Sequence, residues 1–217
     1  MIVAIDGPAG AGKTSVAVAV ASQLGFLHMD TGAMYRTIAV AVLDRHLDID
    51  DPRAVAAAVA SVRMELGNGL ISLDGDDVTS RVRDPDVTRT VSLVAAHPAV
   101  RSALVPLQRQ LATGRDVVVE GRDIATVVFP DAEVKIFLTA SPRERVARRG
   151  TQIGVAADPQ RLAALERDML ARDERDSTRS VSPLQRAESA ELIDSTEMEL
   201  DEVVDRVVAI VNERRRT

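Results

Sequence analysis

Near the start of the chain, glycines, a lysine and a threonine stand at a spacing that suits phosphate binding. Residues 7–14 read Gly-Pro-Ala-Gly-Ala-Gly-Lys-Thr, which satisfies the pattern Gly-x-x-x-x-Gly-Lys-Thr. The glycines allow successive backbone N–H groups to turn inward and form a nest for anions. Lys13 supplies a positive charge to the β- and γ-phosphates, and the Thr14 hydroxyl offers an oxygen to Mg²⁺. The pattern therefore predicts a site for a magnesium-bound nucleoside triphosphate.

The segments on either side of this loop favour that interpretation over an ordinary glycine-rich turn. Residues 1–6 are apolar, as in a short buried strand, and residues 13–24 place apolar side chains on one face of a helix. A strand that leads through the loop into a helix N-terminus directs free N–H groups and the helix dipole at the phosphates. The predicted triphosphate-binding residues are Gly7, Pro8, Ala9, Gly10, Ala11, Gly12, Lys13, Thr14 and Ser15.

A phosphate-binding loop (P-loop) alone is compatible with a GTPase, an ATPase or a kinase. A GTPase carries an Asn-Lys-x-Asp string that reads guanine, and the sequence contains no such string. An ATPase carries an apolar strand that ends in Asp-Glu, whereas the apolar strand expected at residues 116–120 ends in Glu120-Gly121-Arg122-Asp123. A small-molecule kinase needs a second anion site, so that donor and acceptor phosphates lie in line.

Four further segments carry side chains suited to hold a phosphate acceptor. The carboxyl ends of parallel strands line the ligand crevice beside the P-loop, and Arg122 and Asp123 follow such a strand. Arg122 can donate two N–H groups to a phosphate, and Asp123 can accept from an exocyclic amine. The other candidates lie near a helix start after the second strand or on helices further along; they are Thr31, Tyr35, Arg36, Ser92 and Arg101.

A row of arginines near residue 175 has two interpretations. Arg172, Arg175 and Arg179 are spaced i, i+3 and i+7, which predicts that one helix face carries all three. Such a row can span the donor and acceptor phosphates and stabilise the transferred group. Charge runs also mark exposed helices, in which case these arginines pair with Asp168, Asp173 and Asp176. Both interpretations stay open at this point.

Strands alternate with helices along most of the chain, which predicts a parallel sheet with helices on both faces. Strands are expected at 1–6, 26–29, 116–120, 134–138 and 192–194, and helices at 13–24, 33–44, 52–60, 84–95, 98–111, 142–149, 159–175 and 200–214. Residues 62–82 alternate between apolar and polar and contain Gly67-Asn68-Gly69 and Asp74-Gly75. This segment predicts a small antiparallel meander inserted into an α/β domain.

Composition excludes several other classes of protein. The formal net charge of −6 argues against a nucleic-acid-binding protein, and Phe26, Tyr35, Phe129 and Phe137 are too few aromatics for a base-stacking platform. There is no cysteine, which suits a cytoplasmic protein, and no 18-residue apolar run for a membrane span. The three histidines show no metal-ligand spacing, so we expect structural roles for them.

Four segments together resemble the bacterial cytidylate kinases, in the order in which that family has them. They are residues 5–13, the run Asp30-Thr31-Gly32-Ala33-Met34-Tyr35-Arg36, residues 120–132 and the run Arg172-Asp173-Glu174-Arg175-Asp176. The resemblance implies phosphoryl transfer from ATP to CMP or dCMP with Mg²⁺, giving ADP and CDP or dCDP. It implies a three-layer α/β/α fold with a central parallel sheet, an insert that holds a small antiparallel sheet, and a short lid.

The resemblance also implies roles for individual residues. Lys13, Arg122, Arg172 and Arg179 match catalytic positions. The acceptor-binding positions are Arg36, Arg122 and Arg179 around the phosphate, Thr31, Arg101 and Asp123 around the cytosine, Ser92, Arg172 and Asp176 near the ribose, and Tyr35 beside the nucleotide. Glu120 stands where the family often has Asp, at a position that contacts Mg²⁺ through water, and Thr31 stands where the family often has Ser.

The implied layout is a single domain over residues 1–217. Its core comprises residues 1–31, 84–145 and 176–217, with the nucleoside-monophosphate-binding insert at about 32–83 and the lid at about 146–175. We expect a cytoplasmic monomer that binds neither nucleic acid nor membrane. Two alternatives remain: a P-loop kinase for another acceptor such as UMP or AMP, and a non-catalytic nucleotide-binding regulator.

Overall fold

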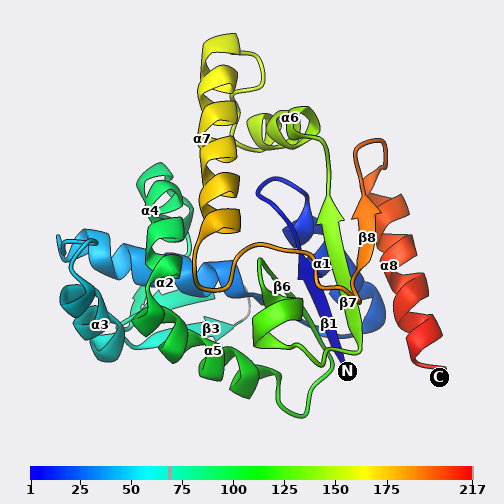
Figure 1. Ribbon diagram of the computed structural model, residues 1–217, viewed down its shortest axis with the longest axis horizontal. Coiled ribbons are helices and arrows are strands. Elements are labelled where there is room, and N and C mark those ends of the chain that lie inside the picture. The colour runs from blue at the N-terminus through cyan, green and yellow to red at the C-terminus, as the bar shows by residue number, and fades with distance from the viewer. Residues whose placement is uncertain (68–69, 217) are drawn as a thin grey trace. The chain divides into compact units, whose positions relative to one another are not determined.

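The computed structural model describes residues 1–67 and 70–216 (Figure 1). The chain divides into two units, each with its own hydrophobic core. Unit 1 comprises Met1–Asp30 and Ala112–Thr217, and unit 2 comprises Thr31–Leu111.

A parallel sheet forms the centre of unit 1. Its strands are β1 (Ile2–Asp6), β2 (Leu27–Asp30), β6 (Val117–Gly121), β7 (Val134–Thr139) and β8 (Glu191–Asp194). Among the described residues their order is β2-β6-β1-β7-β8, and every neighbouring pair is parallel. All strands therefore end at one edge, where the register pairs Ile5 with Glu120 and Asp30 with Glu120. The P-loop and the Glu120-Gly121-Arg122-Asp123 run both leave the sheet at this edge.

Helices α1 (Lys13–Leu24) and α8 (Leu200–Arg214) each bury an apolar face against this sheet. Unit 1 also contains α6 (Pro142–Gln152) and α7 (Pro159–Thr178), which pack on each other, and a short π-helical turn, η2 (Ile124–Val128). Val16 and Val20 of α1 and Val203 and Val207 of α8 are buried in one core with the strand residues Val3, Ile5 and Ile136. This core holds the strand and helix that flank the P-loop in fixed positions.

Unit 2 combines helices with a small antiparallel sheet. The helices are α2 (Thr31–Asp44), α3 (Pro52–Ser61), α4 (Pro85–Ala96) and α5 (Pro98–Ala112), and the sheet has the order β3 (Met64–Gly67), β4 (Leu70–Leu73), β5 (Asp76–Asp77). The 3₁₀ turn η1 (Arg81–Arg83) follows. Arg81 bonds Asp44 of α2 and Asp86 of α4, at 2.9 and 2.7 Å, and so ties this turn to both helices.

The structure confirms the predicted fold class and the meander. The helices α1 and α8 have the predicted bounds, and α4 packs on α2 within unit 2. Some bounds differ from the prediction: α2 begins at Thr31 and not at residue 33, and α6 and α7 continue past their predicted ends to Gln152 and Thr178. Neither α6 nor α7 contains a proline after its first residue, so nothing stops either helix earlier. The predicted turn at Gly67-Asn68-Gly69 lies partly outside the described residues.

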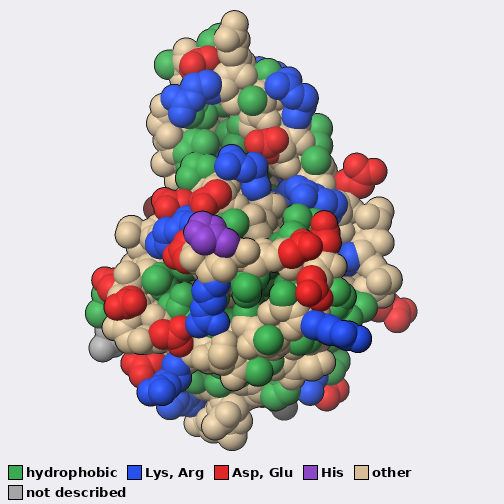
Figure 2. Space-filling model, turned by 90° about the vertical axis from the view of Figure 1, so that its left-hand side faces the viewer, with side chains coloured by type: hydrophobic (Ala, Val, Ile, Leu, Met, Phe, Trp, Pro, Cys, Tyr) green, Lys and Arg blue, Asp and Glu red, His purple; other side chains and the backbone are tan. Residues whose placement is uncertain are grey.

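In the described part of the chain, no single helix is long and apolar enough to cross a membrane. Within residues 1–67 and 70–216, α4 and α5 together have the length and apolar composition of a span, but they are bent by 92° where they join. Figure 2 shows Lys and Arg side chains intermingled with Asp and Glu side chains over the face that it presents.

Candidate active site

The P-loop turns sharply at Gly7 because the chain runs directly against the backbone of β7. A Cβ atom at Gly7 would lie 1.9 Å from the Leu138 carbonyl oxygen, so no other residue fits there. Helix α1 begins at Lys13, and its N-cap is Gly12 with φ +89°. The loop thus runs from a strand end into a helix N-terminus, as the sequence predicted.

Lys13 is buried inside the loop that it serves. Its ammonium group donates a 2.8 Å hydrogen bond to the Pro8 carbonyl oxygen. Burial lowers the pKa of Lys13 well below its ordinary value, and the nearby positive charge of Arg122 lowers it further. Because burial disfavours its charged form, this ammonium group would be stabilised by an anion bound in the loop.

Thr14 and Glu120 lie side by side at the end of β6. The Thr14 hydroxyl donates to Glu120 Oε2 over 2.8 Å, and His28 Nε2 lies 3.0 Å from Glu120 Oε1. Glu120 is buried, so its carboxylate is held in one place by these contacts. His28 was expected to be structural, and sequence reasoning missed its contact with Glu120. The order β2-β6 brings them together, since Asp30 pairs with Glu120 two residues beyond His28.

Asp6 fixes the segment that carries Arg122 and Asp123. Its two carboxylate oxygens accept hydrogen bonds from the backbone N–H groups of Ile124 and Ala125, each at 2.8 Å. Burial raises the pKa of Asp6 to about 6, although the two backbone hydrogen bonds oppose that rise. Asp6 thereby ties the last residue of β1 to the first turn of η2, directly after Asp123.

An arginine cluster surrounds the buried carboxylate of Asp176. Arg122 Nε donates to Asp176 Oδ2 at 3.1 Å, and Arg172 Nε lies 3.8 Å from the same oxygen. Arg179 Nη2 lies 3.7 Å from Asp123 Oδ1. Burial raises the pKa of Asp176, but the charges of these arginines outweigh it, and the pKa lies below the ordinary value. We call Arg122, Arg172, Arg179, Asp123 and Asp176 the arginine cluster.

The cluster combines features of both interpretations of the arginine row. Arg172 and Asp176 do form an i, i+4 ion pair within α7, but Asp176 also binds Arg122 from the end of β6. The prediction that Arg175 shares a face with the other two was wrong. Arg175 is exposed and donates to the Ala171 carbonyl oxygen of its own helix. Arg179 lies beyond the last helical residue in an extended conformation, with φ −60° and ψ 141°.

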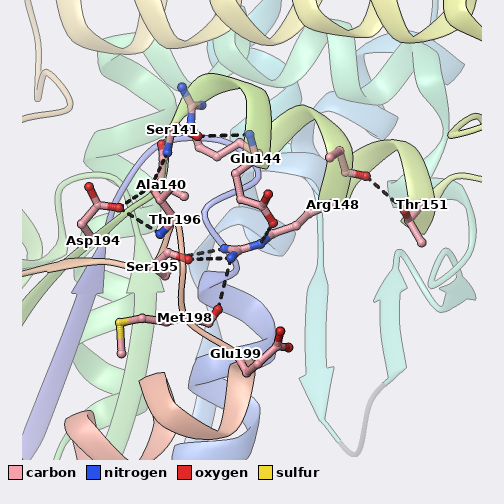
Figure 3. Close-up of polar contacts among 12 residues, drawn as sticks. Ala140, Ser141, Glu144, Arg148, Thr151, Asp194, Ser195, Thr196, Met198 and Glu199 are labelled. Carbon is pink, nitrogen blue, oxygen red and sulfur yellow. Dashed lines mark hydrogen bonds and ion pairs between the residues drawn. The ribbon is translucent and has the colours of Figure 1, made fainter.

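The loops that follow β7 and β8 are joined by a polar network that the sequence did not indicate (Figure 3). Arg148 of α6 donates to the Ser195 hydroxyl at 2.9 Å and to the Ser195 carbonyl oxygen at 2.6 Å. The Ser141 N–H donates to the Thr196 hydroxyl at 2.9 Å, and this hydroxyl donates to Asp194. These bonds hold the start of α6 at the carboxyl edge of the sheet.

The remaining predicted residues lie in unit 2. Arg36 of α2 donates to the Val82 carbonyl oxygen and to the Thr88 hydroxyl, at 3.0 and 2.9 Å. The guanidinium of Arg101, on α5, lies 5.6 Å from the centroid of the Tyr35 ring, within the range of a cation–π interaction. Thr31 is the first residue of α2 and is buried.

Ser92 of α4 is buried, and its hydroxyl has no hydrogen-bond partner among residues 1–67 and 70–216. An unsatisfied buried hydroxyl is costly to a folded protein unless a ligand or water completes it. Unit 2 therefore brings Tyr35 and Arg101 together and offers a buried hydroxyl to a ligand, while unit 1 contains the P-loop, Glu120 and the arginine cluster.

Comparison with known proteins identifies the family. The cytidylate kinase family model matches residues 3–213. The cytidylate kinase of Mycobacterium leprae is 49% identical over 99% of this chain and 96% of its own length, and that of Pelotomaculum thermopropionicum is 48% identical over 99% and 97%. The cytidylate kinase of Desulfitobacterium hafniense is 46% identical over 99% and 94%.

Solved structures agree at the level of the fold. An uncharacterised protein from Eubacterium ventriosum superposes with a TM-score of 0.53 at 13% identity, and the match covers 98% of each chain. A shikimate kinase from Bacteroides thetaiotaomicron superposes with a TM-score of 0.50 at 13% identity, again over 98% of each chain. The full-length sequence matches show that this chain belongs to the cytidylate kinase family of phosphotransferases.

Proposed function

We propose that this chain transfers the γ-phosphoryl group of ATP to CMP or dCMP, giving ADP and CDP or dCDP, in the pyrimidine nucleotide metabolism of the cytoplasm. Membership of the cytidylate kinase family supports the reaction. The observation that carries it in the structure is the arginine cluster, which shares one sheet edge and one unit with the P-loop. A triphosphate cradle beside several guanidinium groups suits transfer between two phosphates better than hydrolysis of one.

In this proposal the donor phosphates occupy the P-loop from Gly7 to Ser15. Lys13 supplies charge to the β- and γ-phosphates in place of its present bond to Pro8. Thr14 and Glu120 suit Mg²⁺, because a hydroxyl and a carboxylate are the oxygen donors that this ion prefers, with water and phosphate completing its coordination. When bound, Mg²⁺ neutralises charge on the phosphates.

The acceptor-binding residues in this proposal are those that the family resemblance implies. Arg36, Arg122 and Arg179 take the acceptor phosphate, and Thr31, Arg101 and Asp123 take the cytosine. Ser92, Arg172 and Asp176 lie near the ribose, and Tyr35 lies beside the nucleotide. The buried hydroxyl of Ser92 and the cation–π contact between Arg101 and the Tyr35 ring support these roles.

Catalysis in this proposal rests on position and charge. Lys13, Arg122, Arg172 and Arg179 stabilise the transferred group, and no covalent intermediate forms. The acceptor phosphate is already anionic at pH 7, so it needs no general base. Residues 146–175 act as a lid over a core of residues 1–31, 84–145 and 176–217, residues 32–83 form the acceptor-binding insert, and the enzyme is a monomer.

Rates with CMP, dCMP, UMP and AMP at fixed magnesium and ATP test the acceptor. We expect CMP and dCMP to be preferred by at least about tenfold in kcat/KM, a difference of about 1.4 kcal/mol in transition-state binding. Preference for UMP or AMP would make the chain a kinase for another acceptor. Nucleotide binding with no ADP formed from any acceptor would instead point to a regulator.

A further inference from the structure

One residue of the P-loop is held on both sides by charged side chains from outside the loop. The Ala9 N–H donates to Asp173 Oδ1 of α7 at 3.1 Å. The Ala9 carbonyl oxygen accepts a 2.9 Å hydrogen bond from Arg145 Nη1 of α6. Arg145 and Asp173 also bond each other, so Ala9, Arg145 and Asp173 form a closed triangle.

Ala9 and Arg145 of this triangle are buried, Asp173 is partly buried, and the triangle is itself anchored. Arg145 is 6% exposed, and its Nε donates to the Ala140 carbonyl oxygen at 3.1 Å, at the end of β7. The next loop residue, Gly10, has φ +75°, a conformation that favours glycine. A Cβ atom there would lie 2.7 Å from Met169 Cε and 2.9 Å from the Arg145 carbonyl oxygen. Helices α6 and α7 therefore both pack directly on the turn of the P-loop.

The same turn of α7 contacts both the P-loop and the arginine cluster. Asp173 contacts the P-loop, while Asp176 accepts a hydrogen bond from Arg122, which follows β6, and lies 3.8 Å from Arg172. Because these residues lie within four positions on one helix, a shift of α7 at Asp173 also shifts the arginine cluster. The Ala9 N–H already donates to Asp173, so the other N–H groups of the loop are the ones left for phosphate.

We propose that Asp173, together with Arg145, is a positioning residue that sets the P-loop for the donor phosphates. Asp173 holds the Ala9 N–H and Arg145 holds the Ala9 carbonyl oxygen. These two bonds fix the orientation of the peptide groups on either side of Ala9, just before the loop turns at Gly10. The inference rests on the proposed function, since it assigns the triphosphate to this loop. Asp173 touches neither substrate in this role, and it acts through the backbone of Ala9.

Three variants separate the parts of the triangle. Asp173→Ala removes both of its bonds, and Asp173→Asn keeps an oxygen for the Ala9 N–H but removes the charge that faces Arg145. Arg145→Lys keeps the positive charge but removes the guanidinium group, whose separate N–H groups bond Ala140, Ala9 and Asp173 at once. Glu174→Ala is the matched control, because it removes an exposed carboxylate one residue along the same helix. Val207→Ala is the stability control, because it opens a cavity in the hydrophobic core against which α8 packs and does not touch the loop.

Calorimetry measures the Kd of ATP and, separately, of CMP, alongside kcat and Tm. We expect Asp173→Ala to weaken ATP binding by roughly tenfold and Asp173→Asn by about threefold. CMP binding should stay within about twofold, and both controls should bind ATP like the parent. Val207→Ala should lower Tm with no change in ATP affinity.

The proposal is overturned if ATP affinity falls no further than in Val207→Ala at the same loss of Tm. It is also overturned if the Kd values of ATP and CMP rise equally, which indicates general damage. Should Asp173→Ala not fold, Asp173→Asn and Arg145→Lys decide between these outcomes. A parent enzyme that prefers UMP or AMP would sink the proposed function and leave the ATP measurement intact as a test of Asp173.

Discussion

The Thr14 hydroxyl donates a 2.8 Å hydrogen bond to the buried carboxylate of Glu120, which joins the first turn of α1 to the end of β6. The P-loop hydroxyl is therefore aimed by a residue 106 positions away in the sequence. This pair offers neighbouring oxygens at the point where the proposed magnesium-bound phosphates lie.

Thr14→Val keeps the shape of the side chain and removes its hydroxyl. We expect a fall in kcat of about a hundredfold and a higher magnesium concentration for half-maximal rate, because an oxygen donor is lost and Glu120 loses its hydrogen bond. Rates across a magnesium titration test this. Thr37→Val is the matched control, since Thr37 is also buried and bonds only its own helix at Ala33 in the described contacts. An unchanged magnesium requirement in Thr14→Val would contradict the assignment.

Lys13→Met should stop turnover without harming the fold. Burial disfavours the charged form of Lys13, so its pKa is lowered in the folded protein. The unfolded chain then binds the extra proton, and this lysine reduces stability at all pH values below its unfolded pKa. We expect the nucleotide-free variant to have a Tm at least equal to that of the parent, and to lose most of the stabilisation by ATP. Thermal unfolding with and without ATP measures both, and a lower Tm without nucleotide counts against this account.

Asp6 should make stability depend on pH in an unusual direction. Its pKa rises from 3.8 to about 6 on folding, so the folded protein holds the proton through that window after the unfolded chain has released it. Its contribution to stability therefore falls as pH rises from about 4 to 6, by on the order of 3 kcal/mol, and stays low above pH 6. Asp6→Asn removes this dependence. Urea unfolding of the parent and of Asp6→Asn at pH 4.5 and 7.5 tests this. The other acidic groups are common to both proteins, so their effect cancels in the difference between the two free energies of unfolding. An equal difference between the two proteins at both pH values would contradict the assigned pKa.

Arg122→Ala should act on the acceptor far more than on the donor. Arg122 lies in the arginine cluster, beyond the loop that holds the triphosphate, and its loss also leaves Asp176 without a 3.1 Å hydrogen bond. We expect the KM of CMP to rise by at least about tenfold and the KM of ATP by less than about threefold. Arg175→Ala is the control, because Arg175 is exposed on the same helix as Arg172 and bonds only its own backbone in the described contacts. An unchanged KM for CMP in Arg122→Ala would mean that the acceptor site is misplaced.

The elements with strong local signals were predictable from the sequence. Helix α1 has a glycine before Lys13 and another after Leu24, with apolar residues at helical spacing between them, and its bounds agree with the prediction. The P-loop was predictable because its chemistry depends on residues that are adjacent in sequence. The run of valines at residues 117–119 identified a strand that is buried on both faces.

The contacts that arise only from tertiary packing were not predictable. The sequence of α6 is that of a charged, exposed helix. Arg145 is nevertheless buried, because α7 packs on α6 and the Ala9 carbonyl oxygen accepts a hydrogen bond from its guanidinium group. Asp173 has nothing in its local pattern that separates it from the neighbouring acids Glu174 and Asp176. The π-helical turn η2 depends on the remote carboxylate of Asp6, which bonds its first two N–H groups.

Asp176 and Asp123 give the arginine cluster built-in counterions. These two carboxylates offset two of the three positive charges of Arg122, Arg172 and Arg179 within the protein itself. An arriving phosphate then exchanges with or joins these fixed carboxylates and displaces little dissolved salt. Affinity for the acceptor should therefore depend less on ionic strength than a bare row of arginines would suggest.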